Sequence, residues 1–310
     1  EYFRTGVSAF EEKDYKSALS AFRKMQDEFP RSEHAVRGWE YIAQCENQLG
    51  NPYDAFEAYQ KIWDDHKGFP RLSVITRNQM AIGNYYLKYK RYANAIDVYE
   101  QIIKNAPFSD VSAAARYSLA QAYIGEKDYP AAKQELQTLI KNHQTSQLVD
   151  DAAFDLGYID YLQSSDIQYD QTATDDAIAS FRRFIHNFPS SQRVYEAQKY
   201  IRELRTKKAK SLYRMGEFYH NIRAPKAAQL AYEEVIEQYP DTKVADEPRA
   251  QLSRLDRAIV KEAEQVRDAR QMAVYREETI REAAQEEREA SALAVQASRG
   301  EGERVEERET

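Results

Sequence analysis

Residues 14–30 read DYKSALSAFRKMQDEFP, and this stretch decides the fold because altered copies of it recur along the chain. The copy places a large side chain, Phe22, four positions after a small one, Ala18, and ends at Phe29-Pro30. Self-similarity at a period of about 20–50 residues is typical of a repeat array. The spacings of the anchoring alanines are 37, 40, 37, 45 and 51 residues, and these alanines are Ala18, Ala55, Ala95, Ala132, Ala177 and Ala228.

A second small residue precedes each anchor by about one helix length. These residues are Gly6, Ala43, Gly83, Ala120, Gly157 and Gly216. A small residue lets two helices approach closely, and the large side chain of the next helix fills the space beside the contact. Proline then ends the second helix, since it cannot donate a backbone hydrogen bond. The pattern resembles the tetratricopeptide (TPR) repeat, which implies an all-α solenoid of about six helix pairs with a long C-terminal helical extension.

Composition agrees with amphipathic helices and argues against several classes of protein. Charged residues make up 31% of the chain and hydrophobic ones 42%, a mixture expected of helices with one solvated face. The net charge of -7 argues against a nucleic-acid partner, because phosphate binding needs clustered basic residues. The single cysteine, Cys45, forms no internal disulfide and is expected to fill a small space in the core.

Two regions depart from the regular repeat. Residues 162–172 are polar and predict a surface loop inside the fifth pair, and residues 192–220 predict one unusually long helix. Residues 253–310 hold 15 acidic and 11 basic side chains and predict a long solvated helix with a disordered end. Packing of this extension on a partner is the less favoured alternative. One apolar heptad column runs through it, consisting of Ile259, Val266, Ala273 and Ile280.

The second half of the chain shows a more specific order of features. These are Asp170-Gln171-Thr172, Ala177, Phe188-Pro189-Ser190-Ser191, Ala197, Ile201, Leu204-Arg205, Ala209, Phe218-Tyr219, Ala227-Ala228 and Tyr239-Pro240-Asp241-Thr242. This order resembles the BamD-type family of outer-membrane β-barrel assembly lipoproteins, and the opening residues 1–66 resemble it too. An additional helix pair near residues 77–107 and the longer C-terminal extension depart from the family's usual five repeats.

The family resemblance implies a lipid-anchored protein on the periplasmic face of the bacterial outer membrane. Its expected partners are the barrel-forming (BamA-like) assembly subunit and unfolded outer-membrane proteins. The family is anchored through an N-terminal lipidated cysteine, and this chain begins at Glu1 without one, so we expect a mature or trimmed form. No cofactor, metal ion or catalytic residue is expected.

The resemblance also divides the chain by role. Residues 1–146 are expected to form an N-terminal TPR array with a groove for substrate peptides. Residues 147–252 are expected to form a C-terminal array that docks on the assembly partner, followed by the charged extension 253–310. The docking residues expected in the last pair are Tyr219, Tyr239, Asp241 and Thr242.

In a TPR stack the first helix of each pair lines the concave groove. Arginine and amide side chains satisfy the backbone of an extended peptide, and tyrosine offers contact area at low entropic cost. Because under a third of interface residues usually carry the binding energy, any one of these positions is more often an ordinary solvated one. The repeat phase predicts a groove lined by Arg37, Tyr41, Gln44, Arg77, Asn84, Tyr117 and Gln121.

Other functions receive less support from the residues. Phosphate-binding, serine-hydrolase and zinc-protease motifs are missing from the sequence, which disfavours an enzyme. Some cytosolic TPR cochaperones hold a C-terminal carboxylate with a clamp of Lys, Asn and Arg side chains. The matching positions here are Phe3, Val7, Tyr41, Arg77 and Ala81, and only Arg77 is similar, so this function is disfavoured. The alternatives left open are another cell-envelope TPR adaptor, a cytosolic scaffold, and a regulatory subunit bound to an enzyme.

Overall fold

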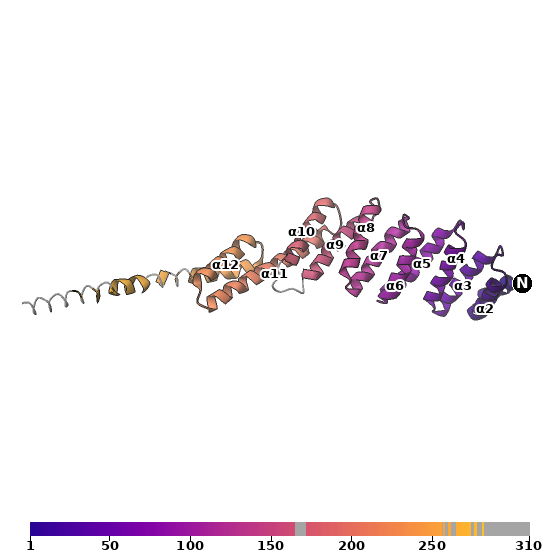
Figure 1. The fold of residues 1–310 in the computed structure, drawn as a ribbon, viewed down its shortest axis with the longest axis horizontal. Coiled ribbons are helices and arrows are strands. Elements are labelled where there is room, and N and C mark those ends of the chain that lie inside the picture. Colours follow the sequence, from indigo (N-terminus) through magenta and orange to yellow (C-terminus); the bar gives the residue numbers. More distant parts are fainter. Residues whose placement is uncertain are drawn as a thin grey trace, which may run out of the picture. The chain divides into compact units, whose positions relative to one another are not determined.

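The computed structural model describes residues 1–164 and 172–255, together with 257, 260–261, 265–273, 276–277 and 281. Every regular element in these residues is helical (Figure 1). In chain order they are α1 (Tyr2–Glu11), α2 (Tyr15–Glu28), α3 (Ala35–Leu49), α4 (Pro52–Asp65), α5 (Leu72–Lys88), α6 (Tyr92–Asn105), α7 (Asp110–Glu126), α8 (Tyr129–Asn142), α9 (Val149–Ser164), α10 (Thr172–Asn187), α11 (Val194–Asn221), α12 (Pro225–Gln238) and the short 3₁₀ helix η1 (Lys243–Ala245).

Contacts divide the chain into two units, Glu1–Leu204 and Arg205–Thr310. In the first unit the pairs α1–α2 to α9–α10 lie side by side in the order of the sequence, and the start of α11 follows them (Figure 1). The second unit contains the rest of α11 paired with α12, and then η1. The expected TPR solenoid of about six helix pairs is therefore confirmed. The boundary falls inside α11, whereas the expected division of roles fell between residues 146 and 147; that division stays a prediction.

In four of the helix pairs a glycine of the first helix faces a large ring of the second. The rings of Phe22, Tyr99, Phe181 and Tyr232 lie against Gly6, Gly83, Gly157 and Gly216, respectively. At Gly83 the approach is so close that an added Cβ atom would lie 2.5 Å from Cε1 of Tyr99. Tyr99 and Phe181 are fully buried, and so are the alanines four positions before them. The expected pairing of small and large residues is thus the core of every one of these hairpins.

The turn from the first helix to the second has one repeated geometry. Its first residue adopts a positive φ, with values of 64° at Lys13, 65° at Lys127 and 59° at Arg223. The next backbone N–H then donates to the carbonyl oxygen five residues earlier, at 2.9 Å for both Asp14 and Asp128. This closes the end of the first helix, whose last carbonyl groups would otherwise lack partners.

The same turn begins the second helix. The carboxylates of Asp14 and Asp128 each accept a hydrogen bond from a backbone N–H of the first turn, at 3.1 Å. Ala224 occupies the equivalent place before α12 with a closely similar backbone, φ -105° and ψ 71° against -81° and 74° at Asp128. Alanine has no acceptor, so α12 begins without a side-chain cap.

Proline separates most successive pairs. The second helices α2, α6, α10 and α12 each stop two residues before a proline, at Pro30, Pro107, Pro189 and Pro240. Steric clash with the proline ring disfavours a helical conformation in the residue before it, and Phe29, for example, has φ -135° and ψ 56°. The next first helix starts a few residues later, so the stack repeats.

Three further expectations concern the departures from the repeat. The long helix predicted near residues 192–220 is confirmed as α11. Cys45 is a free, fully buried thiol, as expected of a small core residue, and burial raises its pKa to about 11. Residues 165–171, which hold most of the predicted loop, lie outside the described residues. So do all residues from 282 onward and eleven residues between 256 and 280.

We predict that Gly83→Ala destabilises the chain. Alanine is the better helix former by about 1 kcal/mol, but its methyl group would enter the ring of Tyr99, which is buried and cannot swing outward. Overpacking of this kind costs about 1–3 kcal/mol. Chemical denaturation should therefore show a net loss of stability, and Gly68→Ala, where nothing lies within 4 Å of the added Cβ, serves as the control.

The next pair offers a compensating change for the same test. There the small residue is Ala120 and its counterpart is Leu136, both fully buried in one cluster. The double variant Gly83→Ala, Tyr99→Leu copies that combination. It should lose less stability than the sum of the two single variants, by about 0.5–3 kcal/mol. Simple additivity would contradict the proposed packing.

We predict that Ala224→Asp stabilises the start of α12. The carboxylate gains the capping bond that Asp14 and Asp128 already make, a contribution of about 1 kcal/mol. Amide hydrogen exchange of α12 should slow roughly fivefold, since exchange reports the local opening free energy. Ala224→Val adds bulk without an acceptor and should bring no such slowing; equal protection in both variants would count against the cap.

Candidate protein-binding surface

The surface expected to bind peptides is formed by the first helices α3, α5 and α7. The first helices α5 and α7 contact one another more extensively than the second helices α4 and α6 do. First helices therefore line the inner side of this part of the stack. We call the surface that carries Arg37, Tyr41, Gln44, Arg77, Asn84, Tyr117 and Gln121 the first-helix face.

The residues of α3 on this face differ in exposure. Arg37 and Gln44 are exposed, and the Arg37 guanidinium lies 5.4 Å from the ring centroid of Phe3 in α1. The ring of Tyr41 is half-buried and stacks on Phe22 at 4.8 Å with an interplanar angle of 4°. Tyr41 therefore helps to hold the first pair against the second, while its edge contributes to the surface.

On α5, Arg77 and Asn84 are both exposed. The side-chain oxygen of Asn84 accepts a hydrogen bond from the hydroxyl of Tyr99 at 2.8 Å. This bond satisfies the one polar atom of a ring that is otherwise enclosed by the hairpin. Asn84 keeps its amide NH₂ group as a donor on the surface.

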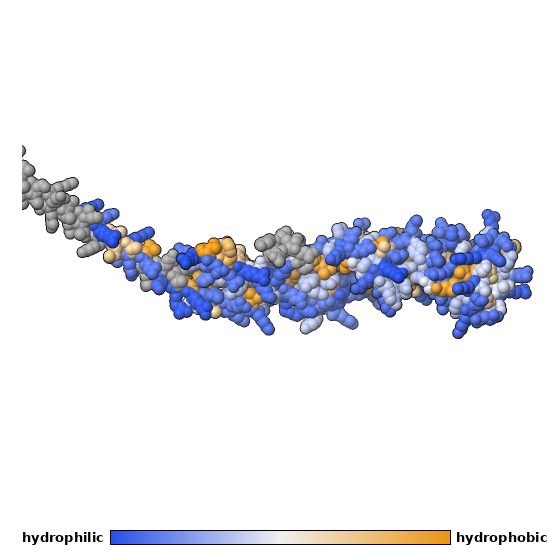
Figure 2. Space-filling model, turned by 90° about the horizontal axis from the view of Figure 1, so that it is seen from below, coloured by the Kyte–Doolittle hydropathy of each residue, from blue (hydrophilic) through white to orange (hydrophobic). Residues whose placement is uncertain are grey.

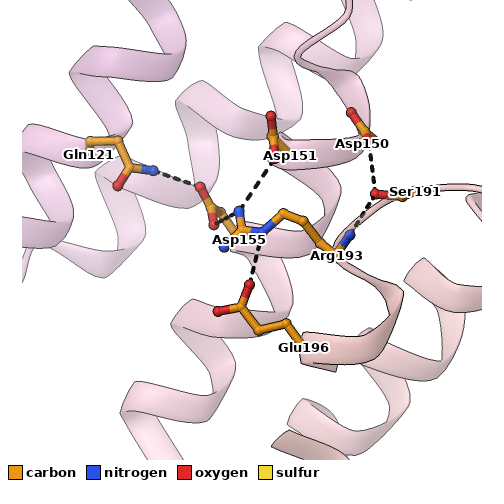
Figure 3. A network of polar contacts seen from close by, with 7 residues as sticks. All are labelled: Gln121, Asp150, Asp151, Asp155, Ser191, Arg193 and Glu196. Carbon is orange, nitrogen blue, oxygen red and sulfur yellow. Dashed lines mark hydrogen bonds and ion pairs between the residues drawn. The ribbon is translucent and has the colours of Figure 1, made fainter. Parts of the chain in front are cut away.

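At α7 the first-helix face joins a polar network that spans three first helices (Figure 3). Its centre is the carboxylate of Asp155 in α9, whose side chain is 6% exposed. Gln121 donates to Oδ2 of Asp155 at 2.6 Å, and Arg193, just before α11, donates to Oδ1 at 3.0 Å. Tyr117 also forms a hydrogen bond with this carboxylate. The structure thus brings two predicted groove residues together at a buried acid.

Arg193 extends the network toward the surface. Its guanidinium lies 3.5 Å from Asp151 and 3.3 Å from Glu196, and it stacks over the ring of Phe154 at 3.6 Å. The Ser191 hydroxyl, which accepts from the backbone N–H of Arg193 at 3.3 Å, donates to Asp150 at 2.8 Å (Figure 3). Three carboxylates around one guanidinium leave this end of the face acidic.

Burial governs the ionisation of the network. Desolvation raises the pKa of Asp155 above its usual value, although the hydrogen bonds from Tyr117, Arg193 and Gln121 oppose the shift. Burial also raises the pKa of Tyr117, and the neighbouring Asp155 charge adds to that effect. Tyr117 therefore stays protonated and donates to the carboxylate. These groups fix the relative positions of the first helices rather than standing ready for a ligand.

A cavity of about 360 Å³ opens between α3 and α5. It adjoins the first-helix face, since Ala81 in its lining lies four residues after Arg77 and three before Asn84 on α5. Tyr85 is 43% exposed and supplies an aromatic wall, and the lining includes no charged side chain. The lining residues are Asn47, Gly50, Pro52, Tyr59, Asn78, Ala81, Ile82 and Tyr85.

Sequence reasoning missed the network centre and the cavity. A carboxylate inside the apolar run Ala152-Ala153-Phe154-Asp155-Leu156 is a readable signal for a buried, paired acid. Arg193 carries no such signal, because it lies 38 residues from Asp155 and reaches it only through the stacking of successive pairs. The cavity likewise depends on the distance between two helices, which residue types alone do not specify.

The expected docking residues of the last pair divide into buried and exposed ones. Tyr239 and Thr242 are 6% and 8% exposed. Tyr239 packs in one cluster with Ala209 of α11 and Val235 of α12, and the hydroxyl of Thr242 donates to the carbonyl oxygen of Tyr239 at 2.8 Å. Asp241 is exposed and forms an ion pair with Arg205 at 2.5 Å, which holds the pKa of that carboxyl below its usual value. Tyr219 is half-buried. Direct contact from the turn is thus left to Asp241.

The described residues contain neither a candidate metal site nor a candidate membrane-spanning helix. Within them, no group of three or more His, Cys, Asp or Glu side chains is placed to hold a metal ion. In the same part of the chain, none of the helices combines the length and apolar character needed to cross a membrane.

Several solved structures are similar to this chain at low sequence identity. The C-terminal part of a TPR repeat-containing protein from Cytophaga hutchinsonii is 16% identical, with a TM-score of 0.40 over 80% of this chain and 86% of that chain. A tetratricopeptide repeat protein from Parabacteroides merdae is 13% identical, with a TM-score of 0.37 over 82% and 97%. PilF of Pseudomonas aeruginosa is 14% identical, with a TM-score of 0.33 over 81% and 96%. Similarity at this level says nothing about function.

Family comparisons are more specific. None of the curated proteins compared with the chain matches it. Residues 2–32 match a tetratricopeptide repeat family, which agrees with the first helix pair. Residues 87–272 match YfiO, a family of outer membrane lipoproteins, so the resemblance to BamD-type proteins is confirmed. Because this match spans more than half of the 310 residues, the chain belongs to the YfiO outer membrane lipoprotein family.

Proposed function

We propose that this chain is a non-enzymatic scaffold of the machinery that assembles β-barrel proteins in the bacterial outer membrane. It acts at the periplasmic face of that membrane. The first-helix face holds unfolded outer-membrane proteins in an extended form, and the C-terminal pairs dock on the barrel-forming subunit. Membership of the YfiO family and the TPR fold support this proposal at the level of a protein-interaction scaffold.

The observation that carries the peptide-binding part is the chemistry of the first-helix face. Exposed Arg37, Gln44 and Arg77 offer several hydrogen-bond donors, which suit the carbonyl groups of an extended backbone. Beside them the cavity between α3 and α5 is walled by Tyr59, Ile82 and Tyr85, with the amide of Asn47 at its rim. Such a surface favours a peptide with apolar side chains and does not require a charged side chain.

We predict that Gln44→Ala combined with Arg77→Ala weakens binding of an extended peptide. The probe is a synthetic C-terminal strand of an outer-membrane barrel protein, and the readout is fluorescence anisotropy with the full chain. Loss of two central donors should lower affinity about tenfold or more, as expected when interface residues that contribute over 1 kcal/mol are removed.

The matched control changes an arginine and a glutamine elsewhere. Arg182 in α10 and Gln137 in α8 are exposed on second helices, so Gln137→Ala with Arg182→Ala should leave affinity unchanged. Equal weakening by both double variants, or by neither, would remove the first-helix face as the binding surface. Thermal unfolding of all variants confirms that the stack is intact.

A second prediction concerns the partner. Tagged chain incubated with detergent-solubilised outer membranes should retain a barrel protein that carries periplasmic repeat domains. Added salt should lower the amount of barrel protein that is retained, because exposed ion pairs between the chain and its partner are screened. Recovery of cell-wall enzymes without the barrel protein would instead favour the alternative of a different envelope adaptor.

A further inference from the structure

The second half of α11 (Val194–Asn221) and the first residue after it expose a row of large apolar side chains. Met215, Phe218 and Ile222 are 40%, 58% and 55% exposed. Their spacings of three and four residues place them on one side of the helix. Figure 2 shows orange residues reaching the surface in the stretch that holds the end of α11 and α12. We call Met215, Phe218 and Ile222 the α11 stripe.

On α3, α5 and α7 of the first unit the position equivalent to Met215 is covered. That position directly precedes the small residue of each first helix, and its occupants Ile42, Ile82 and Leu119 are 2%, 4% and 2% exposed. The second helix of the preceding pair packs on each of these first helices: α2 on α3, α4 on α5, and α6 on α7. Within this fold, what covers such a face is one amphipathic helix.

Helix α1 provides the opposite case inside the same chain. Its positions equivalent to Met215, Phe218 and Ile222 are Thr5, Ser8 and Glu12, counted from Gly6 and Gly216, and all three are exposed. Repeat proteins need polar outer faces where a repeat is left uncovered, since an apolar one promotes aggregation. On α5 and just after it, the positions equivalent to Phe218 and Ile222 hold Tyr85 and Tyr89, which are 43% and 58% exposed but carry hydroxyl groups. The α11 stripe has no polar atom in its three side chains, which favours its contact with a partner.

Charges beside the stripe indicate what kind of helix covers it. Lys210 and Arg214 are exposed and lie eight and four residues before Phe218, along one row of the helix. Glu217 is exposed on a neighbouring row, and Arg223 follows the stripe. The basic side chains outnumber the acidic one, so acidic groups on the partner complement this rim. Antiparallel pairing with a second copy would instead bring Lys210 and Arg214 toward Arg223, which is unfavourable.

We propose that the α11 stripe is the docking site for an amphipathic helix of a partner protein, one whose apolar face is flanked by acidic side chains. The partner helix takes the place that the second helix of a preceding pair takes elsewhere in the stack. This rests on the proposed function in that it specifies the surface through which the last pair docks. It assigns the contact to α11 rather than to the turn at Tyr239 and Thr242.

The test uses the full chain and two synthetic helical peptides. Both have the 14-residue length of α2, α4 and α6 and a leucine face at helical spacing, with either glutamate or lysine at the flanking positions. The variant Met215→Thr, Phe218→Ser, Ile222→Glu copies the polar face of α1. Leu230→Ser, at a 67% exposed position of α12, is the matched control for loss of an exposed apolar side chain.

The glutamate-flanked peptide should bind the wild-type chain at least tenfold more tightly than it binds the triple variant. It should also bind wild type about tenfold more tightly than the lysine-flanked peptide does, and Leu230→Ser should behave as wild type. Equal binding to wild type and triple variant overturns the proposal. So does sedimentation of the wild-type chain as a dimer that the triple variant abolishes, since a second copy is then the occupant.

Outer-membrane pull-down separates this inference from the proposed function. Loss of the barrel protein from the triple variant, with unchanged thermal unfolding, supports both. Peptide binding that depends on the stripe while wild type recovers no barrel protein contradicts only the proposed function. Recovery of the barrel protein by the triple variant at the wild-type level contradicts only the docking site.

Discussion

The contact between a small residue of each first helix and a large side chain of the second is the constraint on which the fold depends. At Gly6, Gly83, Gly157 and Gly216 the ring lies where a Cβ atom would otherwise be. Each hairpin therefore has one spacing and one register, and its outer faces are left to pack on neighbouring hairpins. Stability then accumulates from neighbour to neighbour, as in other repeat proteins.

This arrangement also determines which side chains remain for binding. Second helices cover the first helix of the next pair, so the inner sides of the first helices are left open. Polar groups there serve two purposes. Around Asp155 they are saturated by one another and hold α7, α9 and the start of α11 in place. Between α3 and α5 they border a cavity instead, and Gln44 and Arg77 remain on the surface.

Much of this organisation was predictable because it depends on the spacing of residues that are close together in the sequence. The interval from Ala18 to Phe22 and the recurring glycines predict the helix hairpin and the close contact between its two helices, and both predictions are confirmed. Contacts between distant residues were not predictable: Arg193 meets Asp155 only after two pairs have stacked. Burial of Tyr239 and Thr242 was missed for a related reason, since a turn that looks exposed in sequence folds back onto its own hairpin. Exposure of the α11 stripe was not predictable either, because Met215 occupies the repeat position at which Ile42, Ile82 and Leu119 are buried.

Hydrogen–deuterium exchange with an added barrel-protein strand peptide tests the central claim most directly, because it reports every helix of the stack at once. If the first helices bind the peptide, backbone amide exchange should slow along α3 and α5 and around Tyr117 in α7. Among the second helices, α4 should slow less than α3 and α5, since only its Pro52 and Tyr59 line the cavity, and α6 should be unaffected. Protection confined to second helices, or spread evenly over both members of each pair, would contradict the account.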